Sequence, residues 1–87
     1  WWNDEGLKAL SARVVRAAPN NAAANGMRAT VLSGLCFGAW VVGRRSSAEL
    51  MEAATCYERV AALHPAPAVK AHFSSCALRC RGRAEIM

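Results

Sequence analysis

Residues 46–65 carry both the start signal and the stop signal of a helix. Ser46 is followed three positions later by Glu49, the spacing at which each side chain satisfies a backbone N–H of the other residue at a helix start. Pro65 cannot continue a helix, and it also moves the residue before it out of helical geometry. The stretch therefore predicts a helix over 47–64.

One face of this predicted helix is apolar. Small and apolar side chains, with one histidine, recur at steps of three and four positions, which is the period of a helix face. They are Leu50, Ala53, Ala54, Tyr57, Val60, Ala61 and His64. Such a helix is stable only when its apolar face is buried against other elements, so the rest of the chain must supply packing partners.

Similar signals predict three further helices, approximately over residues 4–18, 21–42 and 67–81. Pro19 ends the first of these and Gly43 ends the second. Pro67 fits the first position of the last helix, where its missing N–H costs nothing. No strand pattern is evident, so residues 1–87 are expected to form one all-α domain of about four antiparallel helices, arranged as stacked helix hairpins.

The pattern that ends the first helix returns at the end of the third. Pro19 and Pro65 lie 46 positions apart, and an Arg-Val pair precedes each proline at the same distance. Similarity at a fixed period indicates repeated helix hairpins.

The second copy spaces a small, an aromatic, a small and a proline residue at Ala53, Tyr57, Val60 and Pro65. This spacing resembles the second helix of a tetratricopeptide repeat. In that family the small residue admits the partner helix, the aromatic residue fills the groove, and the proline turns the chain into the next unit. The period here is longer than the family's period of about 34 residues and overlaps that of HEAT-like repeats.

Three blocks, WWNDEGLKALSARVVRAAPN, MRATVLSG and AELMEAATCYERVAALHPAP, also resemble a module in tetratricopeptide-like proteins of unicellular algae. This resemblance implies no assigned activity. The order of the predicted helices indicates a repeat module whose first and last helices lack their hairpin partners. Because open repeat ends need neighbours, we expect a part of a longer solenoid or a small accessory subunit of a larger complex. Residue 1 is Trp, which suggests a processed chain or a piece of a longer one, and no signal peptide pattern is present.

The second predicted helix leaves a membrane interpretation open. Residues 29–42 are almost entirely apolar, but this run is shorter than the ~20 residues needed to span a bilayer. Extending it includes Arg28, which is costly in lipid. The alternative function is nevertheless a membrane-associated accessory subunit of an algal organellar assembly, such as a photosynthetic one, anchored by residues 27–43.

The net charge of +5 leaves a nucleic-acid interpretation open as well. One basic patch could form from Arg79, Arg81 and Arg83 near the end of the last helix together with Lys70 near its start, and another from Arg44 and Arg45 in the turn before the third helix. Aromatic residues for base stacking are not interleaved with them, and no known nucleic-acid motif is present. A basic RNA-binding helical repeat is thus a further alternative.

Four cysteines, Cys36, Cys56, Cys76 and Cys80, are spread through predicted helices. A secreted disulfide framework would place them in loops rich in glycine and proline, so we expect free thiols in a reducing intracellular compartment, either the cytoplasm or an organelle. A disulfide from Cys56 to Cys76 or Cys80 is the alternative.

A metal site can be drawn from His72, Cys76 and Cys80, which share one helix face. However, residues eight positions apart lie ~12 Å apart along a helix axis, so only two of the three could hold one ion. Buried thiols and a core histidine are the simpler interpretation.

No grouping of residues carries the local signature of a catalytic nucleophile, and no glycine-rich phosphate loop follows a strand. The sequence therefore predicts a non-catalytic chain without a cofactor, which binds another protein or neighbouring repeats in a groove with apolar anchors and a basic rim. The predicted contact residues are Trp1, Trp2, Trp40, Arg44 and Arg45.

Overall fold

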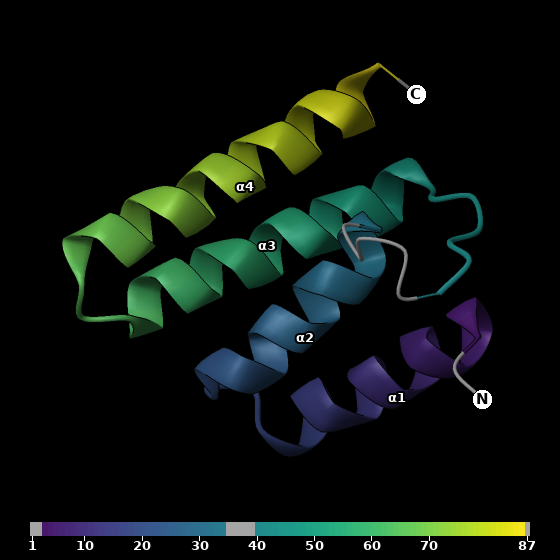
Figure 1. Cartoon of the computed structure of the whole chain (residues 1–87), viewed down its shortest axis with the longest axis horizontal. Coiled ribbons are helices and arrows are strands. Elements are labelled where there is room, and N and C mark those ends of the chain that lie inside the picture. Colours follow the sequence, from purple (N-terminus) through teal and green to yellow (C-terminus); the bar gives the residue numbers. More distant parts are fainter. Residues whose placement is uncertain (1–2, 35–39, 87) are drawn as a thin grey trace.

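The computed structural model describes residues 3–34 and 40–86, and this part of the chain contains four α-helices and no strand. They are α1 (Asp4–Ala17), α2 (Ala22–Ser33), α3 (Ser47–Leu63) and α4 (Pro67–Glu85). Each helix packs against the next one along the chain, and neighbouring helices run in opposite directions (Figure 1). The predicted all-α fold is confirmed, and helices that are neighbours in the sequence are paired as hairpins.

Local capping explains where the helices begin. Ser46 and Glu49 form the predicted capping box at the start of α3, with distances of 3.1 and 2.9 Å for the two hydrogen bonds. Asn3 and Asn21 accept from the backbone N–H groups three residues on, at the starts of α1 and α2. α4 begins at Pro67, as predicted.

The end of α2 differs from the prediction. The helix ends at Ser33 and not near residue 42, because Gly34 adopts a left-handed conformation with φ of 76° and donates its N–H to the Thr30 carbonyl. A glycine in this conformation is a common helix terminator. Residues 35–39 lie outside the described residues, and residues 40–46 are not helical.

α4 is longer than predicted and ends at Glu85, beyond the expected boundary at residue 81. Gly82 lies inside this helix, and a Cβ added there would meet no atom within 4 Å. Glycine inside a helix costs only ~1 kcal/mol relative to alanine, and packing of α4 on α3 outweighs this amount. Of the helices that the structure describes, none combines the length and the apolar character needed to cross a membrane.

The core lies where α2, α3 and α4 meet. Small residues let these helices approach closely, and they include Ala29, Ala53, Ala54 and Ala77, each at most 1% exposed. Tyr57 of α3 fills the centre: its ring lies 6.0 Å from that of Phe73 on α4. Its hydroxyl lies 3.1 Å from the Ser33 hydroxyl on α2, within hydrogen-bond distance. Tyr57 of α3 thus contacts both α2 and α4.

Buried thiols complete this core. Cys56, Cys76 and Cys80 are free and buried, while Cys36 lies outside the described residues. Burial raises the pKa of the Cys56 and Cys80 thiols. A raised thiol pKa disfavours the reactive thiolate, so these cysteines act here as small apolar packing groups.

The helices converge at one end of the molecule. Near this end Ser47 donates to the Ala84 carbonyl and Arg83 donates to the Ser33 carbonyl, which joins the start of α3 to the end of α4, and the end of α4 to the end of α2. Towards the opposite end α2 turns away from α3 and α4 (Figure 1). The divergence opens a space between the first half of α2 and the first half of α4.

Candidate functional site

A surface groove occupies this space. It has a volume of about 390 Å³ and is lined by Ala22, Ala23, Gly26, Val60, His64 and Phe73. The α2 wall consists of small residues, the floor belongs to the last part of α3, and the α4 wall is aromatic. The lining is therefore mostly apolar and lacks a bulky side chain on one side.

Gly26 places no side chain in the α2 wall of the groove. A Cβ added at this position would lie 3.9 Å from Val60 Cγ2, which is an ordinary van der Waals contact. Glycine inside a helix is less favourable than alanine by about 0.5–1 kcal/mol. Neither packing nor backbone conformation requires glycine here, and its effect is to leave the groove open.

His64, which follows the last turn of α3, adds a polar side chain to the lining. Its Nδ1 atom is buried and has no hydrogen-bond partner within the described part of the chain.

Two ring contacts fix the aromatic wall: the His72 ring packs edge-on against Phe73 at 5.1 Å, and the Tyr57 ring stacks behind Phe73. The wall is thus held in place before anything binds.

One face of α4 forms a basic border, which we call the α4 rim. Its members are the exposed side chains of His72, Arg79 and Arg83, which share a face because they are spaced by seven and four positions; Cys76, on the same face, is buried in the core. Arg83 Nη1 donates to the Ser33 carbonyl at 3.0 Å, so this face is turned towards α2. His72 joins the rim to the groove through its contact with Phe73.

The candidate metal ligands His72, Cys76 and Cys80 do not come together in the described part of the chain. His72 Nε2 and Cys76 Sγ are 3.8 Å apart, but no group of three potential ligands comes together around them. Cys80 is buried in the core at 1% exposure.

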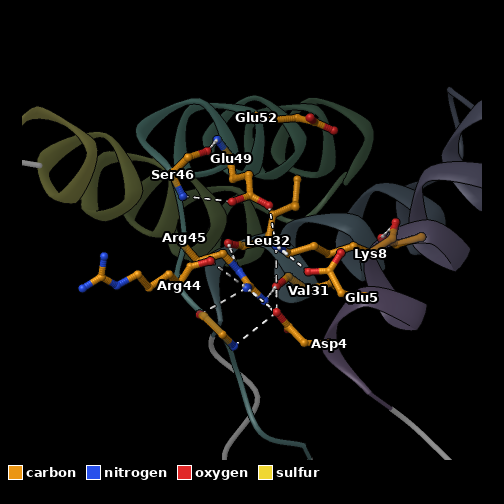
Figure 2. Close-up of polar contacts among 12 residues, drawn as sticks. Asp4, Glu5, Lys8, Val31, Leu32, Arg44, Arg45, Ser46, Glu49 and Glu52 are labelled. Carbon is orange, nitrogen blue, oxygen red and sulfur yellow. Dashed lines mark hydrogen bonds and ion pairs between the residues drawn. The ribbon is translucent and has the colours of Figure 1, made fainter.

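A separate cluster joins α1, the end of α2 and the turn before α3 (Figure 2). Its centre is Arg45, whose side chain is only 3% exposed. Two guanidinium nitrogens donate to the Asp4 carboxylate at 2.6 and 2.7 Å, and the guanidinium also reaches the Val31 and Leu32 carbonyls at 2.9 and 3.0 Å. Trp40 Nε1 donates to the same carboxylate at 2.9 Å. We call these residues the Arg45 cluster.

The Arg45 cluster supplies hydrogen-bond donors to the carbonyl groups at the end of α2. The last carbonyls of a helix lack intrahelical donors and carry partial negative charge. Arg45 supplies donors to two of them and is neutralised by Asp4, so the bidentate pair satisfies both charges. Hydrogen bonds from Arg45 hold the pKa of Asp4 far below its usual range, and the same contact raises the pKa of Arg45.

Two further ion pairs join α1 and α2 to α3. Lys8 Nζ lies 2.7 Å from the Glu49 carboxylate, and this contact raises the pKa of Lys8 and lowers that of Glu49. Arg28 Nε lies 2.8 Å from Glu52, and its Nη1 donates to the Lys8 carbonyl. The pair between Arg28 and Glu52 helps position α2, which forms one groove wall.

Acid should destabilise the fold through these carboxylates. The folded-state pKa of Asp4 and of Glu49 lies below the ordinary values of 3.8 and 4.5, so their contribution is present above those values and is lost as the pH falls through and below them. We expect urea unfolding monitored by circular dichroism to show a falling midpoint below about pH 4.5. An Asp4→Asn variant should start less stable and lose less on acidification. An equal loss in both proteins would contradict the assignment.

The predicted contact residues that the structure describes, Trp40, Arg44 and Arg45, do not belong to the groove lining. Arg45 and Trp40 belong to the Arg45 cluster, and Trp1 and Trp2 lie outside the described residues. Arg44 is exposed and points away from the cluster (Figure 2). Sequence reasoning did not identify the lining of the groove, although a glycine inside a capped helix, at Gly26, was a signal that could have pointed to it.

Comparison with known proteins adds no assignment. The sequence matches no protein-family model, no curated protein and no solved structure. The groove and the Arg45 cluster are therefore interpreted from their own geometry.

Proposed function

We propose that this chain is a non-catalytic, tetratricopeptide-like module that binds another protein, either within a longer solenoid or as a small accessory subunit. Its groove takes up apolar side chains from an extended or helical segment of the partner. Recognition through a groove by a few apolar anchors is a common mode of peptide binding. The observation that carries the proposal is the glycine-walled groove, because Gly26 opens a surface that folding does not require to be open.

The arrangement of the helices supports this function. Three helices contribute to the groove, and the helix in the middle, α3, is buried along one face by the two others. The lining is set by side chains that are already packed, such as Phe73 between Tyr57 and His72. A preformed site loses little conformational freedom on binding, which favours affinity.

The test uses two variants with the same chemical change. A phage-displayed library of random peptides is selected on the folded 87-residue chain, and recovered peptides are measured against Gly26→Leu and Gly82→Leu. Leucine at 26 fills the groove, whereas leucine at 82 meets open space. We expect affinity to fall by about tenfold or more for Gly26→Leu and to change little for Gly82→Leu.

A stability measurement accompanies this test. Gly26→Ala should raise the free energy of unfolding by about 0.5–1 kcal/mol, since alanine fits the space and favours the helix. Recovered peptides that bind Gly26→Leu as tightly as the parent chain would refute the groove as the binding site. A destabilised Gly26→Ala variant would show that the fold itself needs this glycine.

A further inference from the structure

The distribution of charge adds a second property to the groove. Five of the six acidic residues lie in ion pairs with Lys or Arg, at separations between 2.6 and 3.9 Å. They are Asp4, Glu5, Glu49, Glu52 and Glu58. Almost all of the negative charge of the chain is therefore neutralised within the fold.

Most of the positive charge of the chain is not neutralised by carboxylates within the described part of the fold. Four of the eleven basic residues, Lys8, Arg28, Arg45 and Arg81, take part in those ion pairs. Among the described residues, seven basic side chains have no carboxylate partner: Arg13, Arg16, Arg44, Arg59, Lys70, Arg79 and Arg83. The net charge of +5 is thus carried by side chains without a carboxylate partner, of which Lys70 and Arg83 donate to backbone carbonyls.

Two of these seven lie on the α4 rim. Arg83 donates to the α2 backbone and keeps its charge without a counterion. Arg79, one turn earlier, is exposed and makes no hydrogen bond or ion pair with any described residue. It lies on the rim between Arg83 and His72, whose ring contacts the aromatic wall of the groove. None of the described residues that line the groove carries a carboxylate.

We infer that the segment bound in the groove is acidic: a peptide or helix of a partner protein that places carboxylates against the α4 rim beside its apolar anchors. This inference rests on the proposed function and names the chemistry of its partner. Complementary charges at the edge of an interface steer encounter and select the correct partner, while apolar anchors supply most of the affinity. A basic segment would meet unpaired arginines of the same sign and be disfavoured.

A protein partner fits the observations better than a nucleic acid. The described groove lining contains one phenyl ring, that of Phe73, which already contacts the rings of Tyr57 and His72, so it offers no series of aromatic faces for base stacking. The space beside the rim is apolar and suits aliphatic side chains.

The experiment compares two charge reversals of equal size. Arg79→Glu changes the rim, and Arg13→Glu changes an exposed, unpaired arginine on α1 outside the groove lining. Peptides recovered on the parent chain that also depend on Gly26 are sequenced and titrated against both variants. We expect these peptides to carry more Asp and Glu than the unselected library.

The two charge reversals should differ in their effect on the affinity for these peptides. We expect about a fivefold to tenfold loss of affinity for Arg79→Glu, and less than about twofold for Arg13→Glu. An Arg79→Gln variant should give an intermediate loss, and circular dichroism checks that all variants fold.

Three outcomes separate this inference from the function on which it rests. Peptides that depend on Gly26 but carry no excess of acid, or that lose equal affinity in both reversals, would overturn the acidic partner and leave groove binding intact. Recovery of no Gly26-dependent peptide would overturn the proposed function itself. A 20-residue oligouridine that binds more tightly than the peptides and is weakened by Arg79→Glu would assign the rim to phosphates instead.

Discussion

Replacing Arg45 with methionine should lower the free energy of unfolding by about 3–5 kcal/mol. Methionine has a similar length but donates no hydrogen bond. The Asp4 carboxylate would lose its bidentate partner, and the Val31 and Leu32 carbonyls would lose the donors that end α2. Because a domain is stable by only about 5–15 kcal/mol, this change should leave the fold marginal. Urea unfolding followed by circular dichroism measures the loss.

The neighbouring arginine provides the matched control for this result. Arg44→Met makes the same chemical change at an exposed position, and we expect a change within about 0.5 kcal/mol. A double variant, Asp4→Leu with Arg45→Met, removes both charges and should recover part of the stability lost in the single variant. Equal unfolding midpoints for Arg44→Met and Arg45→Met would refute a structural role for the Arg45 cluster.

Replacing Tyr57 with alanine should cost about 3–5 kcal/mol, because the ring fills the centre of the core between α2, α3 and α4. Tyr57→Phe keeps the ring and removes only the hydroxyl, and the Ser33 hydroxyl retains its bond to the Thr30 carbonyl. We therefore expect a cost of about 1 kcal/mol for phenylalanine. The same urea titrations measure both variants.

The comparison between these two variants decides which part of Tyr57 matters. A loss for Tyr57→Phe close to that for Tyr57→Ala would show that the hydrogen bond to Ser33, and not the packing of the ring, holds α2 against α3. The small-to-large change Ala54→Leu, at a position that is 0% exposed, gives an independent check on how tightly this region is packed. Overpacking there should cost about 1–3 kcal/mol.

The Arg45 cluster and the groove have complementary roles in the proposed module. The cluster fixes α2 at the end where the helices converge, and the groove lies at the end where α2 diverges from α4. A wall held at one end and free of bulky side chains at the other can accept a partner without unfolding the core. Glu52 pairs with Arg28 of α2 and Glu49 pairs with Lys8 of α1, so neither carboxylate neutralises the remaining arginines.

The sequence alone determined the helical class and most helix boundaries, because these depend on local information. The capping box at Ser46 and Glu49, the proline at 67 and the apolar period of α3 act within a few residues of one another. The same local reasoning failed at the end of α2. The apolar run through residues 29–42 favours a continued helix, and nothing local indicates that Gly34 takes a left-handed conformation and ends it.

Only the tertiary structure decided the fate of the two adjacent arginines and the position of the groove. Arg44 and Arg45 are equivalent in the sequence, yet one is exposed and the other is buried, because Asp4 and two α2 carbonyls meet at a single point of the fold. The groove likewise depends on the divergence of α2 from α4, which is set by the packing of three helices. Local patterns determine which segments are helical, whereas burial and the pairing of charges depend on contacts between residues far apart in the chain.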